Sequence, residues 1–422
     1  MGFVKNPVKG MCDILPQDMR LRERALSLIK SAYSRYGFEG IETPVMESID
    51  NLLSKQGGEN EKLIFKVLKN GADLQRALER GGELAESGLR YDLTLPLARY
   101  YSNNTNNLAS PFKALQIGSV FRADKPQKGR FRQFTQCDID ILGDESNFAE
   151  IELISATAGM LCTIFSEMGI NDRKFKVHIN DRRILLAIGR MAGFTEDEVS
   201  SALISLDKLD KIGFDGVRAE LIENGYNEQS VDKYLGIYSN AEGQSVESFC
   251  AKIGEEYLDL AVAKSLNEII ECATASVPDT VELCFDPTLV RGMGYYTGPI
   301  FEVTTDGYGF SIAGGGRYDK MIGKFTGKDT CAVGFSIGFE RIITILKDYL
   351  SDEAGKLRGE AIAYLIDKRA PLERKMEIYA EAQALRADGK TVTIVPMKKN
   401  LKFQIEELEK IGYTKFNKIY ND

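Results

Sequence analysis

Apolar residues recur at helical spacing in the segment 16–36, which predicts an amphipathic helix with Leu21, Ala25 and Leu28 on its buried face. An extended segment at 41–45 follows, because Pro44 disfavours helix before it. Further along, the pattern predicts strands at 63–67, 89–94, 112–121 and 133–142, and helices at 95–101 and 148–168.

The second half changes character at 181–277, where we find only helical patterns. Strands are expected again at 281–285 and 300–303. The glycine run 314–316 is expected to form a bulge and to let the backbone approach a ligand closely. A helix at 337–350 and a polar linker at 351–356 precede the tail. The tail alternates strands (361–366, 391–395, 414–419) with helices (371–386, 400–411), as is typical of a small α/β domain with a parallel sheet.

These patterns divide the 422 residues into three predicted domains. Segments 1–180 and 278–350 form a core of mixed α/β class, 181–277 is a helical insertion, and 358–422 is a small C-terminal α/β domain. No apolar run of about 18 residues and no signal-like start is present, so we expect a cytoplasmic protein that does not meet a membrane.

The composition limits the kinds of binding and catalytic site that the chain can form. The net charge of −8 argues against non-specific coating of nucleic acid but permits a local basic patch. The seven cysteines form no C-x-x-C pair, which is typical of reduced thiols and not of a zinc site. His178 is the only histidine, and this excludes a Ser-His-Asp triad, a Cys-His pair and multi-histidine metal centres. An enzyme of this composition would work by positioning and electrostatics.

The most informative stretch lies between the two strands 112–121 and 133–142. Five cations stand within the eleven residues from Arg122 to Arg132, in a chain that is acidic overall. Arginine binds phosphate with fixed, bidentate geometry, so the loop suits a polyanion such as a triphosphate or an RNA end. On charge alone, a solvated hairpin tip is the commoner explanation.

The order of residues favours the polyanion. The segment from Phe121-Arg122 to Arg132-Gln133-Phe134 resembles motif 2 of class II aminoacyl-tRNA synthetases. Glu42-Thr43-Pro44 is similar to motif 1, and the segment 334–341 to motif 3. Longer segments resemble the histidyl-tRNA synthetase family in particular. They are Arg291-Gly292-Met293-Gly294-Tyr295-Tyr296 (R-G-x-D-Y-Y in the family), 314–319 (G-G-R-Y-D), 136–140 (Q-C-D-x-D), 89–96 and 205–211.

This resemblance covers residues 10–419 and implies a fold and a reaction. The implied fold is a six-stranded antiparallel sheet flanked by helices, in a homodimer. The implied reaction joins L-histidine to ATP, with Mg²⁺, as histidyl-adenylate and passes histidine to tRNA(His). In it, Arg122 and Arg291 would be catalytic at the α-phosphate. Arg130 and Arg341 would hold the outer phosphates, with Asp124 close to the nucleotide.

The resemblance also implies a pocket for histidine. Its ammonium would meet Asp92, Thr94 and Gln136. Its imidazole would meet Asp140 and Tyr296, with Tyr295 nearby. The histidine carboxylate would contact Arg122 and Arg291. Gln127 would meet the acceptor end of the tRNA.

Structural explanations stand beside these roles. Arg291 and Arg341 could be buried ion-pair partners, and Asp92 could be a helix N-cap. Tyr295 and Tyr296 could be core aromatics. His178 is expected to be structural, and Lys398-Lys399 to be solvated.

Three departures from the family pattern concern function. Cys12 stands where the family usually has arginine, and Gly294 stands where the signature has an acid. The tail 358–422 resembles the family's anticodon-binding domain but lacks its last strand and helix.

Two other functions are compatible with the same resemblance. The first is a non-catalytic paralogue that binds histidine and regulates ATP phosphoribosyltransferase. Such paralogues usually lose the tail and the ATP arginines, whereas Arg122, Arg130 and Arg341 remain here. The second is a ligase for another amino acid on the same scaffold.

Overall fold

The computed structural model describes residues 3–53, 60–125, 131–239, 241, 243–291, 294–350 and 360–421. Contacts divide the chain into two compact units. One unit comprises Met1–Cys12 with Leu28–Ile342, and the other comprises Asp13–Ser27 with Ile343–Asp422. The predicted three-domain division differs from this one, because the helical segment 181–277 belongs to the larger unit.

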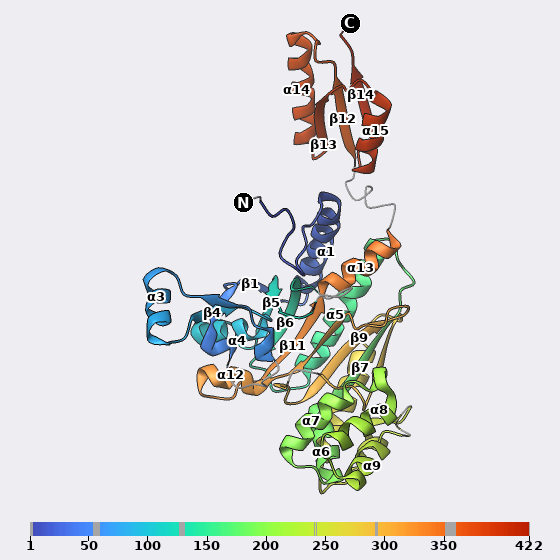
Figure 1. Cartoon of the computed structure of the whole chain (residues 1–422). Helices are drawn as coiled ribbons and strands as arrows, with labels where there is room; N and C mark the ends of the chain where they lie inside the picture. The colour runs from blue at the N-terminus through green and yellow to red at the C-terminus, as the bar shows by residue number, and fades with distance from the viewer. Residues whose placement is uncertain are drawn as a thin grey trace. The chain divides into compact units, whose positions relative to one another are not determined.

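The larger unit is built on an eight-stranded sheet (Figure 1). In spatial order the strands are β1 (Glu39–Ile41), β5 (Phe112–Phe121), β6 (Gln133–Leu142), β11 (Ala332–Gly338), β10 (Ala313–Arg317), β9 (Pro299–Thr305), β7 (Phe175–Asp181) and β8 (Val281–Phe285). The six inner strands, β5 to β7 in this order, are antiparallel to one another, as predicted. One further strand pairs in parallel at each edge, β1 with β5 and β8 with β7.

Strand alternation gives the sheet one apolar and one polar face. On β6, Cys137, Ile139 and Ile141 are fully buried on the apolar face. The helices α5 (Phe148–Glu167) and α11 (Leu260–Thr274) pack against the sheet, and Phe165 of α5 meets Phe175 of β7 with ring centroids 5.4 Å apart. Among the described helices, α5 alone is long and apolar enough to cross a membrane. Its apolar window is 67% buried, as in the core helix of a globular protein.

A second, three-stranded sheet has the order β2 (Met46–Ser48), β4 (Ala85–Leu89), β3 (Lys66–Leu68). Along the chain, the helices α2 (Ile49–Leu52), η1 (Asn60–Leu63) and α3 (Gly71–Arg80) lie between these strands. The helices α4 (Thr94–Asn104) and η2 (Thr105–Asn107) follow β4, and α12 (Asp319–Thr326) follows β10. Two predicted strands were misplaced. The run 63–67 begins as the end of a 3₁₀ turn, and the strand predicted at 89–94 stops at Leu89, so that Asp92 lies in the loop before α4.

Between β7 and β8 the described residues form helices only (Figure 1). They are α6 (Arg182–Ala192), α7 (Glu196–Leu206), α8 (Leu209–Glu223), α9 (Glu228–Gly236), α10 (Val246–Ala251) and α11. A capping box between Thr195 and Glu198 begins α7. The last of them, α11, packs against α5, β7 and β8, so this segment also covers part of the central sheet.

The smaller unit contains the C-terminal strands and helices. They are β12 (Ala361–Ile366), α14 (Leu372–Ala387), β13 (Thr391–Pro396), α15 (Leu401–Lys410) and β14 (Lys415–Ile419). The three strands pair in parallel in the order β13-β12-β14, which confirms the predicted alternation. Two helices, α1 (Pro16–Ser34) and α13 (Phe339–Tyr349), each contribute residues to both units.

Candidate active site

A cavity of about 590 Å³ opens on the polar face of the central sheet. Its size lies within the range usual for small-molecule sites. Alternation along β6 turns Gln136, Asp138 and Asp140 to this face, and all three line the cavity. The register places Asp138 opposite Ser336 of β11, and Glu302 of β9 opposite Gly314 of β10. The cavity is therefore polar along one side of the sheet.

Glycines on β10 and β11 make room for these side chains. A Cβ atom at Gly314 would lie 2.4 Å from Nη1 of Arg291, and one at Gly334 would lie 2.0 Å from Oδ1 of Asp140. The glycine run 314–316 pairs in regular register with β9 and β11, so the predicted bulge is wrong. The space is used by neighbouring side chains that a larger residue would displace.

The cavity brings together the predicted site residues that the structure describes. They come from five separate stretches of the chain: Asp92, Thr94, Arg122, Asp124, Gln136, Asp140, Arg291, Tyr295, Tyr296 and Arg341. Arg130 and Gln127 fall in the basic loop 126–130, which lies outside the described residues.

One end of the cavity is lined by acceptors. Asp92 is 3% exposed, and its Oδ1 accepts a hydrogen bond of 3.1 Å from the backbone N–H of Leu95. Asp92 stands one residue before the N-cap, Leu93, and this bond to the first turn of α4 accounts for one oxygen. The other oxygen, Oδ2, is buried with no partner among the described residues. Gln136 donates from Nε2 to Oγ of Ser336 at 2.7 Å, and its buried Oε1 likewise has no described partner. Burial raises the pKa of Asp92.

Hydrogen bonds of the Arg90 guanidinium stabilise the loop that carries Asp92. Its Nη1 donates to the backbone oxygen of Thr43 at 2.7 Å, and its Nε donates to that of Ser119 at 2.9 Å. Gly118 leaves space for the guanidinium, because a Cβ atom there would lie 2.2 Å from Nη2 of Arg90. Thr43, from the segment similar to motif 1, thereby supports the Asp92 loop.

At the same end, Asp140 accepts a hydrogen bond of 2.6 Å at Oδ1 from the hydroxyl of Tyr318. Burial raises the pKa of Asp140 to about 7, although this hydrogen bond acts to lower it. Tyr295 lies between two other aromatic rings, with centroids 4.8 Å from Tyr296 and 6.0 Å from Tyr318. The two tyrosines of the signature are packed like core residues, and both also line the cavity.

Two arginines bring positive charge to the same cavity. Arg122 donates from Nε to the backbone oxygen of Tyr91 at 3.0 Å, and its guanidinium lies 5.1 Å from the ring centroid of Phe134. Arg341 donates from Nη1 to Oγ of Ser311 at 3.2 Å. These contacts hold both guanidinium groups at the cavity.

Arg291 pairs with Glu302, at 2.5 Å from Nη1 to Oε2, so the ion-pair interpretation holds for one side of this guanidinium. Its Nε is buried and has no partner among the described residues. Glu302 therefore fixes the Nη1 end of the guanidinium, and the buried Nε–H is left as a donor to which a ligand can bind.

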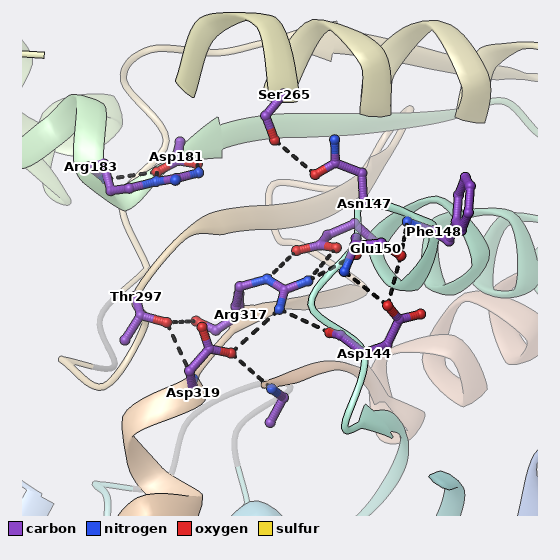
Figure 2. Close-up of polar contacts among 12 residues, drawn as sticks. Asp144, Asn147, Phe148, Glu150, Asp181, Arg183, Ser265, Thr297, Arg317 and Asp319 are labelled. Carbon is purple, nitrogen blue, oxygen red and sulfur yellow. Dashed lines mark hydrogen bonds and ion pairs between the residues drawn. The ribbon is translucent and has the colours of Figure 1, made fainter. Parts of the chain in front are cut away.

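Strand β10 is anchored at its end by Arg317 (Figure 2). This guanidinium forms two parallel bonds with Glu150 of α5, of 2.6 and 2.7 Å, and also donates to the backbone oxygens of Asp144 and Ser146, each at 3.2 Å. Asp319 lies 3.5 Å away and accepts from the N–H of Ala332. Because Tyr318 lies between Arg317 and Asp319, the cluster fixes the residue that meets Asp140.

His178 lies outside the cavity on β7. Its Nδ1 is 2.9 Å from Oδ2 of Asp286, and its Nε2 is 3.1 Å from Oγ1 of Thr304. Burial acts to lower the pKa of His178, but its bonds to Asp286 and Cys284 outweigh burial and raise the pKa to about 10. Both ring nitrogens are engaged, in agreement with the structural role expected from the sequence.

Several cavity residues were not among the predicted site residues, and four of them bear on the polar contacts of the site. Asp138 was detectable, because period-2 alternation places it on the same face as Gln136 and Asp140. Tyr318 stands in the segment resembling G-G-R-Y-D, but nothing in the sequence indicated its contact with Asp140. Glu302 is an isolated acid, and Asp207 stands in the segment 205–211 that resembles the family. The approach of both to the cavity depends on tertiary structure.

The comparisons with known proteins agree with this geometry. A family model described as histidyl-tRNA synthetase matches residues 10–342. A histidine–tRNA ligase of Leifsonia xyli subsp. xyli is 42% identical over 422 residues, covering 97% of this chain and 94% of its own length.

Two solved structures share the fold. The histidyl-tRNA synthetase of Nostoc sp. PCC 7120 superimposes with a TM-score of 0.77 at 26% identity, covering 97% of this chain and 90% of its own. An ATP phosphoribosyltransferase regulatory subunit/histidyl-tRNA synthetase from Bacillus halodurans C also gives 0.77, at 20% identity and full coverage of both chains, which shows the fold alone. Sequence match, fold and cavity agree that the chain belongs to the histidyl-tRNA synthetase family.

Proposed function

We propose that this protein is a histidine–tRNA ligase, which activates L-histidine with ATP and transfers it to tRNA(His). One observation carries the proposal. Three buried polar atoms without described partners line a single cavity, namely Oδ2 of Asp92, Oε1 of Gln136 and Nε of Arg291. A buried polar atom without a partner costs about 1 to 3 kcal/mol, so a ligand that supplies its partner binds with that much advantage.

An α-amino acid fits these three atoms. Its ammonium group would donate to Asp92 and Gln136, with Thr94 beside them. Its carboxylate would lie toward Arg122 and Arg291. The imidazole would then enter the end formed by Asp140, Tyr295 and Tyr296, where Asp140 accepts a ring N–H. A site built to bond the ring nitrogens discriminates strongly against analogues that lack them.

Adenylate formation requires the histidine carboxylate to attack the α-phosphate in line, with pyrophosphate leaving. Negative charge is spread over the phosphate oxygens in the transition state, and fixed cations stabilise it. Arg122 and Arg291 would act at the α-phosphate, and Arg341 with Arg130 at the outer phosphates, with Asp124 near the nucleotide. Mg²⁺ would enter with ATP, held by phosphate oxygens and water. Within the described residues no group of three or more His, Cys, Asp or Glu side chains is arranged to hold a metal ion.

The remaining assignments follow the family. The terminal ribose of tRNA(His) would attack the adenylate, with Gln127 near the acceptor end and the C-terminal domain 358–422 at the anticodon. The core 1–180 and 278–350 would do the chemistry beside the helical insertion 181–277. The working form would be a cytoplasmic homodimer.

A regulatory paralogue would need the histidine pocket but no phosphate site. Here Arg122 and Arg341 both line the cavity beside that pocket, which favours catalysis.

Histidine-dependent ATP–pyrophosphate exchange tests the proposal, run in parallel with each of the twenty amino acids. We expect exchange with histidine alone and charging of tRNA(His). Folded protein that binds histidine without exchange would favour the regulator, and exchange with another amino acid would favour a different ligase.

A further inference from the structure

The side-chain amide of Gln136 is bonded at its nitrogen and unbonded at its oxygen. Its Nε2 donates to Oγ of Ser336 at 2.7 Å, and both carboxyl oxygens of Asp138 lie 3.4 Å from the same nitrogen. Its Oε1 is buried and has no partner among the described residues. Three oxygens therefore gather at the donor end of the amide, and the acceptor end is left for a ligand.

The register of the sheet explains why Ser336 makes this contact. Directly opposite Gln136 stand Gly118 on β5 and Gly338 on β11, and neither has a side chain that could hold the amide. Ser336 lies two residues before Gly338 on β11, at the diagonal position that is still within reach across strands. Asp138 stands opposite Ser336, so the hydroxyl, the carboxyl and the amide form one group on the polar face of the sheet.

The direction of these bonds decides which end of the amide a ligand meets. Turning the amide by 180° exchanges its NH₂ for its oxygen, and the surrounding hydrogen bonds select one orientation. Burial and the charge of Asp140 raise the pKa of Asp138, whereas its hydrogen bond with Ser336 acts in the opposite direction. Because the Ser336 hydroxyl donates its proton to Asp138, it offers a lone pair to the amide nitrogen of Gln136. In the reversed orientation, oxygen would meet oxygen at this point.

We propose that Ser336 is a positioning residue of the histidine site, which orients the amide of Gln136 so that Oε1 accepts from the substrate ammonium. Asp138 acts in the same sense, because it accepts from the Ser336 hydroxyl. An ammonium group carries donors only, so a reversed amide would present two further N–H donors to it. This proposal rests on the proposed function and adds two residues to its histidine subsite.

The competing explanation is a cross-strand hydrogen bond that stabilises the sheet and has no effect on the ligand. Ser311 provides a matched control, because it also lines the cavity but its Oγ accepts from Nη1 of Arg341, at 3.2 Å. Ser311→Ala and Ser336→Ala each remove one hydroxyl from the same cavity, and only the second removes the partner of Gln136.

The first experiment measures histidine binding by calorimetry, in the full chain and without ATP. In Ser336→Ala we expect Kd to rise about 3- to 10-fold, the worth of one hydrogen bond, and in Ser311→Ala to stay within about twofold of wild type. Ser336→Thr keeps the hydroxyl and should recover most of the affinity. In exchange assays of Ser336→Ala, the KM for histidine should rise, with kcat and the KM for ATP close to wild type. A lowered Tm with an unchanged histidine Kd would overturn the proposal.

The second experiment asks whether Ser336 acts through Gln136. Gln136→Ala should weaken histidine binding about 10- to 100-fold, as expected for a bond to a charged group. Adding Ser336→Ala to that variant should then weaken binding no further, because the amide that Ser336 orients is gone. Additive losses would overturn the proposal, since Ser336 would then act independently of Gln136. Wild type that binds histidine without exchange would contradict the proposed function alone, so the two failures are distinguishable.

Discussion

Two arginines of the central sheet region each pair with a glutamate, and they differ in what remains. Arg317 engages its guanidinium with Glu150, two backbone oxygens and Asp319, and Glu150 is only 1% exposed. Arg291 pairs with Glu302 through Nη1 and retains a buried Nε without a described partner. The first arrangement is complete within the protein, whereas the second leaves one buried donor, which we propose a ligand engages.

This difference distinguishes an arginine that stabilises the fold from an arginine that we propose acts on substrates. A fully bonded buried pair fixes the backbone around it, and removing one partner leaves an uncompensated charge. A donor left open in a cavity lowers stability and is retained where a ligand uses it. Both arginines belong to segments that resemble family motifs, so the motif alone does not distinguish the two roles.

Arg317→Met should have the largest effect on stability. It leaves Glu150 buried and unpaired, and we expect a loss of about 3 to 5 kcal/mol in the free energy of unfolding, measured by urea denaturation. The double variant Glu150→Gln with Arg317→Met should recover part of the loss. An unchanged denaturation midpoint would show that the cluster in Figure 2 does not hold β10.

Arg291→Ala should reduce activity strongly and stability little, which is the opposite of Arg317→Met. Exchange activity should fall by about 10² to 10³, as when one preorganised donor to a transition state is removed, and histidine affinity should fall far less. The free energy of unfolding should stay close to wild type. Equal losses of binding and exchange would mean that Arg291 serves substrate binding and not the transition state.

Asp92→Asn extends the comparison to an acceptor. Removing the charge opposite the ammonium should weaken histidine binding by about 10- to 100-fold, the worth of a charge-assisted hydrogen bond, as measured by calorimetry. Because burial raises the pKa of Asp92, its ionised form is costly in the free protein, and the variant should be as stable as wild type or more stable at pH 7.5. A destabilised variant would assign Asp92 to capping alone.

The pH dependence of histidine binding reports on Asp140. Its pKa of about 7 means that the accepting, ionised form is lost as pH falls below 7. We expect Kd to rise up to about tenfold between pH 8 and pH 6. In Asp140→Asn this dependence should flatten, and an equally steep profile in that variant would assign the titration to another group.

His178→Asn should have the smallest effect, about 1 kcal/mol in unfolding free energy, with exchange unchanged. The pKa of His178 is raised to about 10, so its contribution is complete below pH 6.5 and disappears as pH rises through 10. Wild type and variant should therefore differ most near pH 6 and converge near pH 10. Lost exchange activity would contradict the structural role.

The sequence predicted the elements whose periodicity is strong and local. The strands 112–121 and 133–142 and the C-terminal alternation were found with nearly the right bounds, because each buries a continuous apolar face. The strand expected at 89–94 was wrong because Asp92 bonds to the N–H of Leu95 and begins a helix instead. The alternative of Asp92 as a helix cap was the local sign of that bond.

The site residues divide in the same way, into those that local sequence identifies and those that only tertiary contacts bring to the cavity. The motif residues were identified from their order, and the cavity unites those that are described. Asp207, Glu302 and the Tyr318–Asp140 bond were missed, since each depends on contacts between residues distant in sequence. The predicted bulge at 314–316 failed because the strand pairs in regular register. Close neighbours require the glycines instead, namely the guanidinium of Arg291 at Gly314 and the backbone oxygens of Gly334 and Pro299 at Gly315 and Gly316.

A structure of the protein with histidine and a non-hydrolysable ATP analogue would show which atoms of the cavity contact the substrates. We expect the histidine ammonium within hydrogen-bond distance of Oδ2 of Asp92 and Oε1 of Gln136, and Nε of Arg291 bonded to the α-phosphate or to the histidine carboxylate. Ligands bound elsewhere in the cavity, with those three atoms still without partners, would contradict this expectation.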